Sequence, residues 1–122
     1  MGQIIADTNI FIYLLKNDLQ LGHLLDKKTI YISYITELEL LSFPKISIKE
    51  IDLIKELINN CNIIHYSEDL KDDIIFLRRK YRLRIPDAII AATALAYFIP
   101  LITADRNFRR IKEIETSIYT IS

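Results

Sequence analysis

Four acidic residues stand where one expected structural element gives way to the next. Asp7 ends an apolar run, Glu39 lies on the first turn after a β-rich run, Asp87 opens an apolar helix, and Asp105 follows another apolar run. The carboxyl ends of parallel strands share one edge of a sheet, where ligands bind in open α/β folds. We therefore expect Asp7, Glu39 and Asp105 at that edge, joined by Asp87 if its helix starts there. Each acid also has a local explanation, because acids stabilise helix N-termini.

Grouped carboxylates imply a cation. Like charges in one cleft repel, so some of the carboxylates would hold protons at neutral pH unless a cation compensated them. The two histidines and the single cysteine do not form a cluster with metal-ligand spacing. A set of oxygen ligands selects Mg²⁺ or Mn²⁺ over Zn²⁺. Such an ion activates water and neutralises charge on a phosphodiester, so the predicted chemistry is metal-assisted phosphodiester hydrolysis.

The elements that would position these acids alternate along the chain. Short β-rich or apolar runs predict strands, and the segments between them carry apolar residues at helical spacing. The expected strands lie at residues 3–6, 29–33, 62–66, 101–103 and 118–121. Strands that alternate with helices predict an α/β fold with a parallel sheet and helices on both faces.

Local signals predict where the first helices begin. Thr8 and Asn9 are expected to cap the helix that follows the first strand. Thr36 and Glu39 have the spacing of a capping box at the start of a later helix.

Two further helices are expected in the C-terminal third. Pro86 suits the first residue of a helix that continues over 87–98. This segment has almost no polar face, so the helix should be buried. A shorter helix is expected at 107–113, before the last strand.

The composition excludes several classes of protein. With 122 residues, 51% of them hydrophobic, the chain is expected to form one domain over 1–122. The 16 basic and 16 acidic residues cancel, so any nucleic-acid binding must rest on a local patch. Two glycines are too few for a GxGxxG or Walker-type nucleotide loop.

The sequence also indicates where in the cell the protein is expected. One cysteine, Cys61, excludes an internal disulfide, and no basic leader precedes Asp7. The longest nearly apolar run, 88–101, is too short to span a bilayer. We expect a soluble, cytoplasmic protein without a membrane partner.

The order and spacing of four motifs resemble those of the PIN-domain ribonucleases, especially the VapC-type toxins of toxin–antitoxin pairs. The motifs are Asp7-Thr8-Asn9, the segment at 32–40, Pro86-Asp87-Ala88 with the residues up to 94, and the segment at 101–108. The resemblance implies a three-layer α/β/α fold whose five-stranded parallel sheet has the order 3-2-1-4-5. It also implies RNA cleavage with Mg²⁺ or Mn²⁺, homodimers, and inhibition by a small antitoxin protein.

The resemblance assigns metal-binding and catalytic roles to Asp7, Glu39, Asp87 and Asp105. The family pattern places its glutamate three residues after a threonine, which selects Glu39 over Glu37. The two glutamates cannot face the same way on one helical turn, because they are two positions apart.

Four polar residues match supporting positions of the family. The resemblance gives Thr8, Asn9 and Thr103 the role of orienting the carboxylates by hydrogen bonds. Asn107 stands where the family often has a second aspartate, and it can bind a metal without contributing charge. One metal ion or two are both compatible with this set.

A basic run precedes Asp87. It consists of Arg78, Arg79, Lys80, Arg82 and Arg84. One interpretation is a solvated helix end that complements the helix dipole. The other is a patch beside the catalytic pocket that grips RNA phosphates.

Two other functions are alternatives to a ribonuclease. A receiver-like phosphoacceptor domain would need paired acids after the first strand, where only Asp7 occurs, and a lone aspartate after the third. A catalytically silent PIN-like domain would bind RNA or protein without cleaving it.

Overall fold

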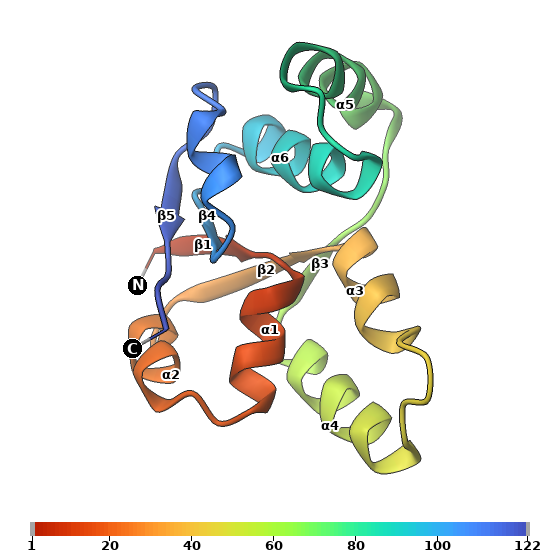
Figure 1. The fold of residues 1–122 in the computed structure, drawn as a ribbon, viewed down its shortest axis with the longest axis vertical. Coiled ribbons are helices and arrows are strands. Elements are labelled where there is room, and N and C mark those ends of the chain that lie inside the picture. Colours follow the sequence, from red (N-terminus) through yellow and green to blue (C-terminus); the bar gives the residue numbers. More distant parts are fainter. Residues whose placement is uncertain (1, 122) are drawn as a thin grey trace.

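The computed structural model describes residues 2–121 and contains one sheet between two layers of helices (Figure 1). All neighbouring strands are parallel, and their order is β3-β2-β1-β4-β5. The strands are β1 (Gln3–Ala6), β2 (Thr29–Ser33), β3 (Asn62–Ile64), β4 (Leu101–Thr103) and β5 (Thr116–Ile118). The three-layer α/β/α fold and the strand order expected from the sequence are therefore confirmed.

Helices connect the strands and cover both faces of the sheet. They are α1 (Thr8–Leu15), α2 (Leu19–Leu25), α3 (Tyr34–Leu41), α4 (Ile48–Asn59), α5 (Glu68–Tyr81), α6 (Ile85–Tyr97) and the short 3₁₀ helix η1 (Arg106–Arg110). None of the helices described within residues 2–121 is both long and apolar enough to cross a membrane.

The central strand β1 shows how the two faces are filled. Ile5 packs against buried residues of α5, α6 and η1, whereas Ile4 and Ala6 pack against buried residues of α1, α2, α3 and α4. All three side chains are buried, because both faces of a parallel sheet are covered. The two apolar cores fix β1 in the middle, and with it the residue that follows, Asp7.

Helix α6 is buried as expected, although it starts earlier than the sequence suggested. It begins at Ile85, so Pro86 lies at its second position and Asp87 in its first turn. The start remains compatible with proline, because the first N–H groups of a helix lack intrahelical partners. The helix ends at Tyr97, and its C-cap residue, Phe98, has a left-handed backbone (φ 54°).

Two predicted helix caps are wrong. The N-cap of α1 is Asp7 itself, whose carboxylate accepts a hydrogen bond from the Ile10 backbone N–H at 3.2 Å, rather than Thr8 or Asn9. The N-cap of α3 is Ser33, because β2 passes directly into this helix. Thr36 therefore lies inside the helix and is buried.

The C-terminal elements are shorter than predicted and displaced. The expected helix at 107–113 is the 3₁₀ turn η1, and β5 begins two residues before the predicted strand. Pairing with β4 sets this register, since Leu101 N–H donates to Glu115 O and Tyr119 N–H donates to Thr103 O. These contacts between strands were not visible in the polar local sequence around Glu115.

Candidate metal centre

The four acids singled out from the sequence line one cavity of about 350 Å³ at the carboxyl edge of the sheet. Asp7 follows β1, Asp105 follows β4, Glu39 comes from α3, and Asp87 comes from the first turn of α6. The other lining residues are Thr8, Asn9, Ile12, Ser42, Phe43, Arg84, Ile90 and Phe108. Four segments that are distant in sequence thus bring carboxylates and apolar walls to one place.

Asp7 is the most deeply buried acid of the cavity, with 5% of its surface exposed. Its carboxylate accepts hydrogen bonds from the Thr103 hydroxyl and the Ile10 backbone N–H. The pKa of Asp7 is raised to about 6: burial is the largest cause, the negative charges of Asp105 and Asp87 add to it, and the two hydrogen bonds act in the opposite direction. At neutral pH this carboxylate is therefore ionised at an energetic cost, which a nearby cation would reduce.

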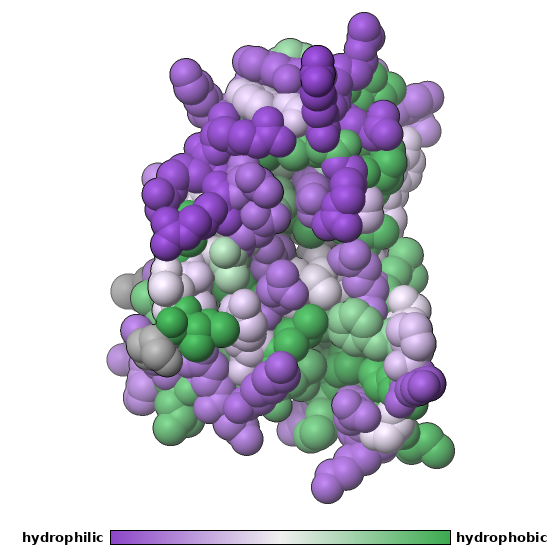
Figure 2. All heavy atoms as spheres, in the orientation of Figure 1, coloured by the Kyte–Doolittle hydropathy of each residue, from purple (hydrophilic) through white to green (hydrophobic). Residues whose placement is uncertain are grey.

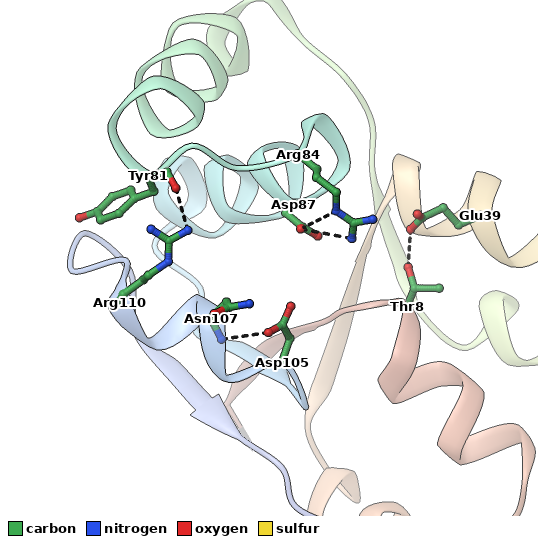
Figure 3. A network of polar contacts seen from close by, with 8 residues as sticks. All are labelled: Thr8, Glu39, Tyr81, Arg84, Asp87, Asp105, Asn107 and Arg110. Atoms are coloured by element: carbon green, nitrogen blue, oxygen red, sulfur yellow. Dashed lines mark hydrogen bonds and ion pairs between the residues drawn. The ribbon is translucent and has the colours of Figure 1, made fainter.

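Glu39 is held over the cavity by Thr8. The Thr8 hydroxyl lies 2.6 Å from Glu39 Oε1 (Figure 3). Thr36 Oγ1 lies 3.4 Å from the same hydroxyl. This contact joins the first turn of α1 to α3. Glu37 does not line the cavity, so the geometry selects Glu39 as the glutamate that faces the other acids.

Asp87 is engaged by an arginine that precedes it on the chain. Arg84 Nε and Nη2 lie 3.3 and 3.4 Å from Asp87 Oδ2 (Figure 3). Arg84 is the N-cap residue of α6 and also lines the cavity. The negative charge of Asp87 is therefore partly compensated by the Arg84 guanidinium.

Asp105 and Asp7 share a supporting hydroxyl. Asp105 N–H donates to Thr103 Oγ1 at 3.0 Å, and the same hydroxyl donates to Asp7. The Asp105 carboxylate caps η1 by accepting the Asn107 backbone N–H at 2.9 Å. In Figure 3 this carboxylate points from η1 toward the space below Asp87.

The donor chemistry fits a hard divalent cation, although the side chains are not gathered around one point. Within residues 2–121, no three His, Cys, Asp or Glu side chains lie close enough to hold a metal together. Thr8, Arg84 and the Asn107 backbone each bind a different one of these carboxylates. The cavity offers oxygen ligands without histidine or cysteine, the set that suits Mg²⁺ or Mn²⁺.

Comparison with known proteins identifies the family. The family model for the PIN domain matches residues 4–114. The chain belongs to the PIN domain family. A search of curated proteins gives no match.

Solved structures of toxin–antitoxin complexes share the fold of this PIN domain. A toxin–antitoxin complex from Klebsiella pneumoniae is 30% identical, with a TM-score of 0.84, and the match covers 97% of this chain and 99% of that chain. VapBC2 from Rickettsia felis, bound to a DNA fragment from its promoter, is 23% identical with a TM-score of 0.88 over 97% and 99% of the two chains. VapBC-1 from nontypeable Haemophilus influenzae is 25% identical with a TM-score of 0.79 over 95% and 97%.

The receiver-like alternative is wrong. Receiver domains have the strand order 2-1-3-4-5, whereas this PIN domain has β3-β2-β1-β4-β5. The only acid that directly follows β1 is Asp7, and β3 is followed by His65.

The basic run that precedes Asp87 is divided by the fold of the PIN domain. Arg84 lines the acidic cavity, and Arg82 and Arg84 both line an adjacent hollow. Arg79 and Lys80 line a separate hollow with Phe76, and Lys80 Nζ pairs with Glu113 at 2.6 Å. Arg78 is exposed and lines none of the cavities described here. The run therefore does not act as one continuous patch beside the acids.

Sequence reasoning missed one basic residue near the site. Arg110, at the end of η1, lines the adjacent hollow together with Arg82 and Asn107. The signal was a second cluster of arginines in η1, at 106, 109 and 110. Its proximity to the site depends on how η1 packs against the end of α5, which local sequence does not reveal.

Proposed function

We propose that this PIN domain is a Mg²⁺- or Mn²⁺-dependent endoribonuclease, a hydrolase that forms the toxin half of a toxin–antitoxin pair and acts in the cytoplasm. The observation that carries the proposal is the one cavity that Asp7, Glu39, Asp87 and Asp105 all line. Acids arriving from four separate elements are not explained by helix capping alone, because Glu39 caps no helix. Membership of the PIN domain family supports the same conclusion.

The four carboxylates are the residues that would hold the cation. When bound, a divalent ion would activate water as a nucleophile and neutralise charge on the phosphodiester. Thr103 orients Asp7 and fixes the backbone of Asp105, and Thr8 orients Glu39. We assign to one of these carboxylates the role of accepting the proton released by the attacking water.

The apolar part of the cavity has a separate role. Ile12, Phe43, Ile90 and Phe108 line it beside the acids. Apolar walls lower the local dielectric, which strengthens interactions between the charged groups and the substrate. Asn9, which also lines the cavity, offers an amide that can orient a carboxylate or the substrate.

The proposed partners are RNA, a small antitoxin and a second copy of the chain. The antitoxin is supported by the structural neighbours from Klebsiella pneumoniae and Haemophilus influenzae, which are toxin–antitoxin complexes. An apolar hollow of about 300 Å³ lies between α1 and α4, where Figure 2 shows hydrophobic side chains, and a protein partner could cover it. The family resemblance supports the homodimer.

The test is incubation of the purified chain with several RNAs in Mg²⁺, in Mn²⁺ and in EDTA. We expect cleavage with either ion, none in EDTA, and a loss of at least about a hundredfold in the Asp87→Asn variant. Folding of the variant is checked by circular dichroism. RNA binding without cleavage by the wild-type chain would instead support the catalytically silent PIN-like domain.

A further inference from the structure

A second hollow adjoins the acidic cavity, and three of its eight lining residues are arginines. Its volume is about 180 Å³, and it shares Arg84, Asp87, Asp105 and Phe108 with the acidic cavity. The residues that it adds are Arg82, Leu83, Asn107 and Arg110. We propose that this hollow, the arginine subsite, binds a backbone phosphate of the polynucleotide next to the one that is cleaved; the inference rests on the proposed nuclease function.

The guanidinium of Arg110 is fixed in place. Its Nη2 donates to the Tyr81 backbone carbonyl at 2.7 Å, and its guanidinium lies 5.7 Å from the centre of the Tyr81 ring (Figure 3). The Tyr81 hydroxyl is itself held by Glu113 and by the Lys112 N–H. The remaining N–H groups of Arg110 have no hydrogen-bond partner within residues 2–121, so a preoriented donor is available to a phosphate.

Arg82 reaches the same hollow through an unusual backbone conformation. It ends α5 with a left-handed φ of 55°, which is uncommon for a residue other than glycine. The turn buries the next residue, Leu83, and leaves the Arg82 side chain exposed. That side chain forms no hydrogen bond or ion pair within the described chain, whereas the turn that carries it is anchored, because Arg82 N–H and Leu83 N–H both donate to Arg78 O.

The charge balance of the subsite favours an anion. Three guanidinium groups face two carboxylates, and one of these, Asp87, is already paired with Arg84. The Asp105 carboxylate accepts the Asn107 backbone N–H at the other side of the hollow. Because the whole chain carries equal numbers of basic and acidic residues, this local excess is not the result of a generally basic protein.

A phosphate is the anion that best fits this arrangement. Guanidinium groups bind phosphate oxygens through paired N–H donors, and backbone phosphates follow one another along a strand. If the cleaved phosphate of a polynucleotide lies at the four acids, a neighbouring phosphate of the same polynucleotide would therefore lie near Arg82 and Arg110. The subsite would hold the strand in register without reading its bases.

The experiment compares two double variants that remove the same charge. Arg82→Ala/Arg110→Ala removes two arginines of the subsite, and Arg106→Ala/Arg109→Ala removes two exposed arginines of η1 that line none of the cavities described here. Binding of a short labelled single-stranded RNA, and of DNA of the same sequence, is measured by fluorescence anisotropy in EDTA over a range of salt concentrations. EDTA makes the readout independent of cleavage, so a failed nuclease assay and a failed binding test are distinguishable.

We expect the subsite variant to bind both strands about tenfold more weakly and to lower the salt slope by about 0.7 for each lost phosphate contact. The control variant should stay within about twofold of the wild type. Arg82→Ala alone should show about a threefold loss. The Arg82 side chain has no hydrogen bond or ion pair to lose within the described chain, so this loss would not come from a folding defect. Equal losses in both double variants, no loss in either, or a loss confined to RNA would overturn the phosphate assignment.

Discussion

Arg84 and Asp87 form an ion pair at the boundary between the acidic cavity and the arginine subsite. Both contacts, at 3.3 and 3.4 Å, are made to the same oxygen of Asp87. The Arg84 side chain is 80% exposed, and that of Asp87 is 22% exposed. The arginine is therefore a solvent-exposed counter-charge on an acid that we propose as a metal ligand, and a metal ion would compete with it.

The first prediction concerns this competition. Arg84→Ala should tighten Mn²⁺ binding by about twofold to fivefold, because exposed ion pairs contribute about 1 kcal/mol or less. The same variant should weaken RNA binding, since Arg84 also lines the arginine subsite. Isothermal titration with Mn²⁺ and anisotropy with RNA measure the two effects. Weaker Mn²⁺ binding in the variant would show that Arg84 supports the metal site instead of opposing it.

The second prediction separates the two glutamates of α3. Glu39→Gln should lower the rate of RNA cleavage by at least about tenfold, because Glu39 faces the cavity and is oriented by Thr8. Glu37→Gln, two positions away, is the matched control and should stay within about twofold. Rates are compared at saturating Mg²⁺. A larger loss of rate in Glu37→Gln than in Glu39→Gln would assign the catalytic role to Glu37.

The third prediction concerns the pH dependence of stability. Burial raises the pKa of Asp7 from 3.8 to about 6, so the folded state binds this proton more tightly than the unfolded chain. The ionisation of Asp7 therefore lowers the free energy of unfolding. This loss is absent below about pH 4, grows as the pH rises toward 6, and is then constant at about 3 kcal/mol or less. Asp7→Asn should therefore be more stable than the wild type at neutral pH and gain nothing near pH 4. Urea unfolding at both pH values measures this, and a difference that does not change with pH would refute it.

The fourth prediction concerns the hydroxyl shared by Asp7 and Asp105. The Thr103 hydrogen bond lowers the pKa of Asp7, so Thr103→Val should raise that pKa further. Mn²⁺ affinity at a fixed pH near 7 should fall, and the lower limb of the pH–rate profile should move to higher pH. Thr93→Val is a useful control, because Thr93 is also buried but bonds only to the Ile89 carbonyl of its own helix. A pH profile that shifts equally in both variants would count against the role of Thr103.

The sequence predicted the arrangement of the acids where strand ends determine it. Asp7 and Asp105 follow strands β1 and β4, which pair in parallel with Ala6 opposite Ile102, so their side chains must emerge at one edge. The apolar pattern of α6 likewise predicted a buried helix. These features follow from burial on both faces of a parallel sheet, because buried strands and helices have recognisable patterns of apolar residues.

Contacts between elements were not predictable in the same way. The bond from Thr8 to Glu39 spans 31 positions, and the one from Arg110 to Tyr81 spans 29. Both depend on how helices and turns pack against one another. The periodic pattern of apolar residues, which predicts the elements, does not predict such contacts. The cap of α1 was misassigned for a related reason: Asp7, Thr8 and Asn9 can all cap a helix, and only the extended backbone of Asp7 decides among them.

The most direct test of the central claim is a crystal structure of the protein soaked with Mn²⁺, read from its anomalous difference map. We expect one strong peak in the acidic cavity, in direct contact with carboxylate oxygens from the set Asp7, Glu39, Asp87 and Asp105, with Arg84 moved away from Asp87. A map with no peak in this cavity at saturating Mn²⁺, or with the ion bound by other residues, would contradict the assignment of the metal site to these acids.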